Sequence, residues 1–147
     1  MVMSQKITVA AAHVAPVYLD TRATVEKTCA YIQKAADAGV QLIAFPESFV
    51  PGFPLWPALS APICNHEFFK RFAAASVHVP GPEVLKICSA ARDAGVMVSI
   101  GISEATKRSV GCLWNSNLLI GADGAILNHH RKLVPTFYEK MIWASGD

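Results

Sequence analysis

The chain has 147 residues, of which 52% are hydrophobic and 16% charged, and its formal net charge is +2. This length suits one ordinary domain, and the charge is too small to indicate binding to nucleic acid or to a charged membrane surface. The charged fraction lies below the roughly 25% of typical soluble domains. Either a partner or the rest of a larger fold covers apolar surface, or an alanine-rich composition inflates the apolar count.

Neither a targeting segment nor the spacing of the cysteines indicates a location outside the cytoplasm. No apolar run reaches the ~18 residues that a membrane-spanning helix needs, and residues 1–6 lack the zones of a signal peptide. The cysteines have no CxxC or CxxxC spacing, so a zinc site is not expected, and a reducing compartment without disulfides is the default. The four are Cys29, Cys64, Cys88 and Cys112.

The first 45 residues predict a strand, a helix and a second strand. Apolar residues 7–12 form a short strand pattern, and Asp20 or Thr21 can cap a helix that stops at Gly39. Residues 40–45 are nearly all apolar, as in a strand covered on both faces. Such a βαβ unit implies parallel strands and a right-handed crossover. The expected inward face of the helix consists of Val25, Cys29, Ile32 and Ala36.

A proline-rich segment, residues 46–62, follows and reads as a long loop. Asn65 can cap a helix that carries three phenylalanines. Gly81-Pro82 opens another helix, which ends at Gly95. The phenylalanines of the first helix are Phe68, Phe69 and Phe72. The inward residues expected for the second helix are Val84, Leu85, Cys88 and Ala91.

The last part of the chain predicts three more strands. They cover residues 96–102, 117–120 and 125–130, and Gly121-Ala122-Asp123-Gly124 is the turn signal of a hairpin. The element order is therefore β-α-β-loop-α-α-β-β-β, and the fold class is α/β.

Glu47 is the first candidate for chemistry, in the segment Phe45-Pro46-Glu47. It follows the carboxyl end of a buried parallel strand, the edge at which open α/β sheets bind ligands. Apolar neighbours would desolvate the carboxylate and tune it for general-base work. From position alone, a solvated loop glutamate is an equally good interpretation.

Lys132 and Glu139 are the other candidates. His129-His130-Arg131-Lys132 ends the last strand, and a lysine there can stabilise a developing anion, although a basic surface end of a strand has the same pattern. Adjacent histidines on a strand point to opposite faces, so they are no ready metal pair. Glu139 lies seven positions after Lys132 and could equally belong to a surface loop.

Together the segments resemble the nitrilase superfamily of carbon–nitrogen hydrolases. Phe-Pro-Glu at 45–47 is similar to the motif of the family's first glutamate, and His-Arg-Lys-Leu-Val-Pro-Thr at 130–136 is similar to its lysine motif. Glu139 matches the second glutamate. Pro51-Gly52-Phe53-Pro54, together with Trp56 and Trp143, resembles the nitrilase branch rather than the aliphatic amidases.

The resemblance implies a domain over residues 6–147, incomplete at its C-terminus, that forms part of a four-layer α-β-β-α sandwich. It implies an enzyme that converts a nitrile to a carboxylic acid and ammonia. In that role Glu47 is the base, Lys132 stabilises the anion and Glu139 orients the lysine. A small nitrile or amide would be the substrate, with no metal or organic cofactor, and copies of the chain would associate into a homo-oligomer.

The family's nucleophile is a cysteine located roughly 25–30 residues beyond the second glutamate, and none of the four cysteines has that place. We therefore expect the 147-residue chain alone to be inactive. The alternative is a non-catalytic half-domain that binds a full-length homologue as an assembly partner, and an unrelated α/β small-molecule binder is a third possibility. The identity of the substrate is left open.

Overall fold

In the computed structural model, residues 6–147 are described, so residues 1–5, part of the start considered above, lie outside the described residues. Five strands form one sheet in the order β1-β2-β3-β4-β5. These strands are β1 (Val9–Ala11), β2 (Leu42–Ala44), β3 (Met97–Thr106), β4 (Ser109–Ile120) and β5 (Ile126–Arg131). The first three are parallel, and β4 and β5 follow antiparallel to their neighbours. The α/β class and the βαβ unit predicted from the sequence are confirmed.

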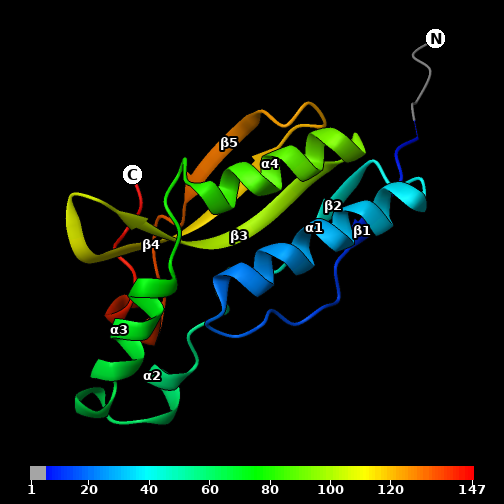
Figure 1. Cartoon of the computed structure of the whole chain (residues 1–147). Coiled ribbons are helices and arrows are strands. Elements are labelled where there is room, and N and C mark those ends of the chain that lie inside the picture. Colours follow the sequence, from blue (N-terminus) through cyan, green and yellow to red (C-terminus); the bar gives the residue numbers. More distant parts are fainter. Residues whose placement is uncertain (1–5) are drawn as a thin grey trace.

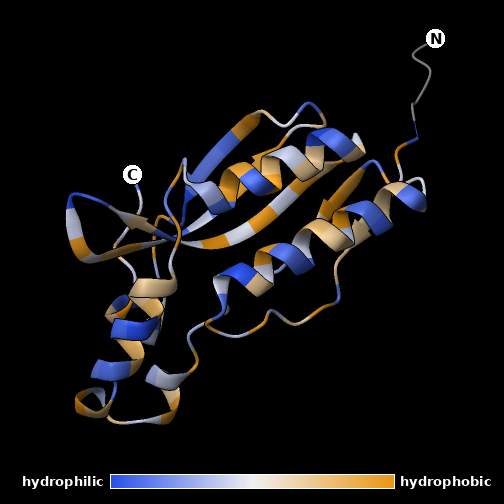
Figure 2. Cartoon of the chain, viewed as in Figure 1, coloured by the Kyte–Doolittle hydropathy of each residue, from blue (hydrophilic) through white to orange (hydrophobic). Residues whose placement is uncertain are grey.

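Two long helices, α1 (Thr21–Asp37) and α4 (Pro82–Ala94), lie side by side on one face of the sheet (Figure 1). The core between them and the sheet is apolar, with side chains such as Ile32, Val98 and Ile100 fully buried. Figure 2 shows that both helices alternate hydrophobic and hydrophilic residues, whereas β1 and β2 are mostly hydrophobic. This pattern is that of helices with one face on a core and one face in water.

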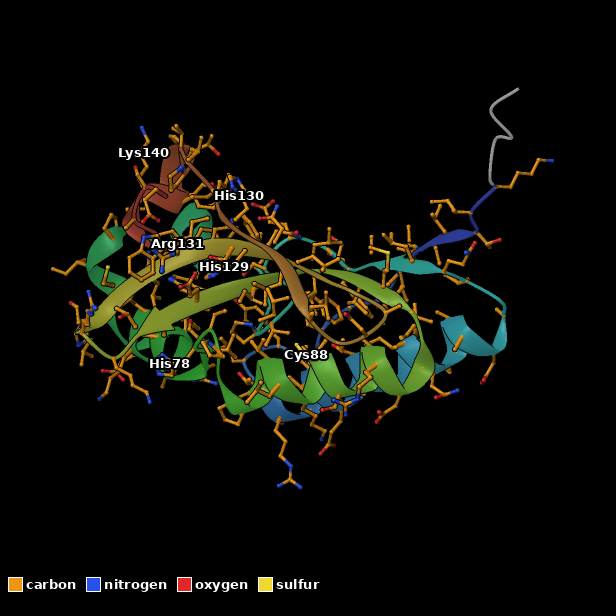
Figure 3. All side chains as sticks on the ribbon, turned by 90° about the horizontal axis from the view of Figure 1, so that it is seen from above. His78, Cys88, His129, His130, Arg131 and Lys140 are labelled. Carbon is orange, nitrogen blue, oxygen red and sulfur yellow. The ribbon has the colours of Figure 1, made fainter. Side chains whose placement is uncertain are left out.

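The other face of the sheet is more open. Val9 is 59% exposed, Asn117 is exposed, and Leu42, Met97 and Leu119 are only partly buried. In Figure 3, α1 and α4 lie below the sheet, and the 3-10 helix η2 (Phe137–Met141) lies above one end of it.

The helix boundaries agree with the local signals of the sequence. The Asp20 side chain accepts a hydrogen bond from the Ala23 N–H and caps α1. Gly39 and Gly95 have positive φ after α1 and α4, where a left-handed residue ends the helix.

Some details differ from the predictions. Thr24 and Thr28 are buried in α1, because Thr28 Oγ1 donates to the Thr24 carbonyl and needs no water. Leu85 is 55% exposed and Ile87 takes its place inside. Asn65 stands at the cap position of α3 (His66–Ala75), but its amide donates to the Ser60 carbonyl instead of capping the helix.

The segment 46–62 is irregular, as predicted, apart from the single helical turn α2 (Trp56–Leu59). The 3-10 helix η1 (Pro62–Cys64) begins at its last residue. Together with α3 and η2 they enclose a second, aromatic cluster at one end of the sheet. Its buried members are Trp56, Phe72, Leu113, Ile142 and Trp143. Among residues 6–147, no helix is long and apolar enough to cross a membrane.

Candidate active site

Three charged side chains that are far apart in the sequence meet at one end of the sheet. Lys132 Nζ donates to Glu47 Oε1 at 2.9 Å and to Glu139 Oε2 at 2.8 Å. A further contact joins Lys132 Nζ to Glu139 Oε1 at 3.1 Å. The structure thus brings together all three site residues predicted from the sequence, with the ammonium between two carboxylates.

Glu47 is held by a short arch of chain that crosses β3. On one side of the arch the Phe45 N–H donates to the Ser99 carbonyl, and on the other side the Val50 N–H donates to the Gly101 carbonyl. Gly101 lies under the arch, where a Cβ atom would come within 2.6 Å of the Pro46 carbonyl oxygen and 2.7 Å of the Glu47 Cα. Glycine is needed here for the close approach of two backbones.

Ser48 makes the sharp turn of this arch. It is fully buried with φ +46°, a left-handed conformation that non-glycine residues seldom adopt. Its backbone carbonyl accepts from the Gly52 N–H, and its hydroxyl donates to the Gly52 carbonyl. Such a conformation is retained only where the surroundings fix it, and it often occurs beside functional residues.

Glu139 is fixed by η2. Its carboxylate accepts from the Thr136 N–H at 2.8 Å, while the Thr136 side chain accepts from the Glu139 N–H, so the two form a capping box. The helix is anchored below by Trp143, whose indole N–H donates to Ser103 Oγ and whose backbone N–H donates to the Glu139 carbonyl. The carboxylate that contacts Lys132 therefore has little freedom to move.

The charges of Lys132 and Glu139 stabilise each other. Partial burial opposes the charge on Lys132, but hydrogen bonds from its ammonium to Glu139 and Glu47 outweigh this effect and raise its pKa. Burial likewise opposes the charge on Glu139, whose side chain is 8% exposed, but Lys132 and the Thr136 N–H lower its pKa. Both groups stay ionised at neutral pH.

Glu47 is more accessible than the sequence suggested. Its side chain is 49% exposed, so the strongly apolar environment that we expected around it is wrong. It lines a cavity of about 260 Å³ together with Lys132, Asn115 and His130, and we call it the polar cavity because every lining residue except Gly101 has a polar side chain. The two histidines point to opposite faces, as predicted, since His129 Nε2 lies 2.7 Å from Glu104 on the helix side, whereas His130 lies on the upper side of the sheet in Figure 3.

A larger, mostly apolar cavity of about 630 Å³ lies beyond η2. It is lined by Trp56, Phe69, Met141 and neighbouring residues, and it contains none of the three charged groups. The smaller polar cavity is therefore the candidate site, because the groups that can move protons are there.

No cysteine lines the polar cavity. Cys29 and Cys88 pack against the main core, where burial raises the pKa of each thiol. Cys64 is exposed on η1, and Cys112 is half-buried in β4. Among the described residues, no group of three His, Cys, Asp or Glu side chains is arranged to hold a metal ion.

Sequence reasoning missed two features of the site. Asn115 Nδ2 donates to Glu47 Oε1 at 2.6 Å, yet an asparagine inside a strand gives no pattern by itself. On the opposite side of the same strands, buried Glu104 accepts from Ser116 and Arg131, at 2.6 Å each. Arg131 also stacks on the ring of Trp114, 4.0 Å from its centroid. The Arg131–Glu104 pair clamps the end of β5 next to Lys132.

Comparison with known proteins gave three findings. Residues 8–147 match the family model "Carbon-nitrogen hydrolase". The chain is 40% identical over 142 residues to an arylacetonitrilase of Hypocrea virens and 37% identical over 131 residues to a cyanide hydratase of Gibberella baccata. These alignments cover 95% and 89% of this chain, but only 42% and 36% of the relatives.

The fold is also similar to that of a solved amidase from Nesterenkonia sp., with a TM-score of 0.70 and 18% identity. The match covers 96% of this chain and 48% of the amidase. The chain thus spans less than half the length of each of these proteins.

Proposed function

The chain belongs to the carbon–nitrogen hydrolase family, and from this premise we propose that it supplies the acid–base groups of a site that hydrolyses nitriles to carboxylic acids and ammonia. The observation that carries the proposal is the position of Lys132 Nζ, 2.9 Å from Glu47 and 2.8 Å from Glu139. In this proposal Glu47 is the general base, Lys132 stabilises the developing anion, and Glu139 holds Lys132 in place and charged.

The roles follow from which group can change its proton. The raised pKa of Lys132 and the lowered pKa of Glu139 keep both ionised, so Glu47 is the member of the cluster that accepts the proton. In this proposal the nucleophile is a cysteine from the part of the relatives' length that these 147 residues do not span, and the polar cavity has none of its own. A free thiol with a pKa near 8.5 is only a few per cent ionised at pH 7, so it needs such a base.

The thiol proton moves to Glu47 while the sulfur adds to the nitrile carbon. The nitrogen gains the electron pair, is stabilised by Lys132, and takes up the proton that Glu47 accepted. Water adds to the thioimidate, ammonia leaves, and a second water hydrolyses the remaining thioester to the acid. Loss of a single group that stabilises such an anion typically costs about 3 kcal/mol in the barrier, or roughly 100-fold in rate.

A nitrile rather than an amide is supported by the relatives of higher identity. Relatives of 37–40% identity are named arylacetonitrilase, nitrilase and cyanide hydratase. The amidase of 18% identity supports the fold only.

The test is to complete the site. The chain is fused at residue 147 to the downstream half of the Hypocrea virens arylacetonitrilase, and ammonia release from an arylacetonitrile is measured. We expect turnover by the fusion, none by the 147-residue chain alone, and loss of turnover in Lys132→Ala. Lys140→Ala is the matched control, because Lys140 is an exposed lysine next to Glu139 in η2. Retained turnover in Lys132→Ala would remove Lys132 from its role.

A second candidate function is a non-catalytic half-domain that assembles with a full-length homologue. The observation that favours it is the absence of a cysteine from the cavity. A stable complex with a full-length relative at defined stoichiometry, combined with a fusion that releases no ammonia, would support this function instead.

We also propose that the protein acts in the cytoplasm as a homo-oligomer. Four free cysteines are compatible with a reducing compartment. Large apolar side chains such as Val9 and Leu127, 59% and 56% exposed, support association through the sheet. Light scattering on the purified protein tests the oligomeric state, and a monomer over the whole concentration range would contradict it.

A further inference from the structure

We propose that Asn115 is a positioning residue that holds Glu47 with one carboxylate oxygen bound and the other turned to the cavity. This inference rests on the proposed function, since it assigns the atom of Glu47 that receives the proton. Asn115 lies in the middle of β4, and its side-chain amide donates to Glu47 Oε1 at 2.6 Å. The same oxygen accepts from Lys132 Nζ at 2.9 Å.

The two donors to Glu47 Oε1 leave Oε2 free. Among residues 6–147, no hydrogen bond to Glu47 Oε2 is present, and Glu47 lines the polar cavity. A carboxylate oxygen that already accepts two short hydrogen bonds has little remaining capacity for a proton, whereas the unbound oxygen keeps all of its own. The geometry therefore makes Oε2 the proton acceptor.

Asn115 is built to hold this orientation rigidly. It is 5% exposed, it lies opposite Ser103 of β3, and the pairing of β4 with β5 begins at the next residue, Ser116. Its backbone carbonyl accepts from the Lys132 N–H at 2.7 Å. One residue thus sets the position of Glu47 through its side chain and the position of Lys132 through its backbone.

The amide contributes what Lys132 alone cannot. Lys132 divides its ammonium between Glu47 and Glu139, and its interaction with the substrate anion would weaken its hold on Glu47. Asn115 is neutral, short and buried, so its hydrogen bond to Glu47 persists while charge develops elsewhere.

The first experiment needs no activity. In amide NMR spectra of the 147-residue chain, we expect one side-chain proton of Asn115 to lie downfield and exchange slowly compared with exposed Asn128 on β5. Glu47→Ala should move this proton back toward the position of an unbound amide. The proposal would be overturned if the Asn115 amide protons had the shift and exchange rate of those of Asn128 and did not change in Glu47→Ala.

The second experiment measures the reaction in the fusion protein. Asn115→Leu keeps the size of the side chain and removes the donor. A hydrogen bond to a charged group corresponds to a loss of about 10- to 100-fold in kcat. We expect this loss with KM within about twofold, because the residue acts through Glu47 rather than on the substrate. Asn115→Asp should lose more activity, since it places a second carboxylate against Glu47.

Asn128→Leu is the matched control and should keep its kcat. A kcat of Asn115→Leu equal to that of the parent would overturn the proposal, and so would a change confined to KM. If no version of the fusion releases ammonia, the proposed function fails, and the amide signal decides alone whether Asn115 holds Glu47. Failure of Asn115→Leu to fold leaves the decision to that signal as well.

Discussion

Gly101→Ala tests how closely the arch that carries Glu47 must approach β3. The added Cβ would lie 2.6 Å from the Pro46 carbonyl oxygen and 2.7 Å from the Glu47 Cα, and both are backbone atoms that no side-chain rotation can clear. The Ser48 N atom lies closer still, and ordinary contact begins at 3.4 Å, so clearing the Pro46 oxygen alone requires a shift of about 0.8 Å and clearing Ser48 N requires more. Such a shift of the Glu47 backbone would strain or lengthen the hydrogen bond between Asn115 and Glu47, which is now 2.6 Å long.

We expect this overpacking to lower the free energy of unfolding by about 1–3 kcal/mol. In the fusion protein, a displacement of the base approaching 1 Å should cost up to roughly 100-fold in kcat. Urea denaturation of the chain and ammonia release by the fusion measure the two effects. Gly121→Ala is the control, because its closest neighbour is the movable carboxylate of exposed Asp123. Equal stability and equal turnover for Gly101→Ala and Gly121→Ala would refute the reasoning.

Three further predictions concern the core, the ion network and the thiols. Phe72→Ala, at a fully buried ring, should destabilise the chain by about 3–5 kcal/mol in urea denaturation, whereas exposed Phe137→Ala should change stability by about 0.5 kcal/mol at most. Burial opposes the charge on Glu104, but the hydrogen bonds that it accepts from Arg131 and Ser116 lower its pKa. The ionised carboxylate therefore contributes to stability above about pH 4.5, and this contribution is lost as the pH falls further. Glu104→Gln should therefore cost about 3 kcal/mol at pH 7 and show a flatter loss of stability between pH 5 and 3, and an unchanged acid transition would contradict this. Iodoacetamide should modify exposed Cys64 well before Cys88, because Cys88 is buried and burial raises its pKa. Equal rates of modification of the two cysteines in peptide mass spectrometry would contradict this difference.

Much of the fold could be predicted from the sequence because its signals are local. Asp20 and Gly39 mark the ends of α1 through hydrogen bonds and backbone conformation within a few residues. The turn 121–124 between β4 and β5 has the same local origin. The first part of β4 was missed, since Ser109–Asn115 pairs with β3 across an exposed turn at Lys107-Arg108 that carries no glycine or proline.

The site also combines residues with local sequence signals and residues without them. Glu47, Lys132 and Glu139 could be identified because each lies in a recognisable segment next to a strand end. Asn115 could not, because its role depends on contact with a residue 68 positions away. The half-exposed state of Glu47 could not be predicted from the sequence either. Its apolar neighbours in the chain pack under the arch and leave the carboxylate in the cavity.

The most direct test of the central claim, that Glu47 is the base of this site, is ammonia release by the fusion protein carrying Glu47→Gln. The amide can still accept from Lys132 and Asn115 but cannot take up the thiol proton. We predict that turnover is lost while the urea midpoint stays close to that of the parent fusion. Turnover at the parental rate in Glu47→Gln would contradict the assignment.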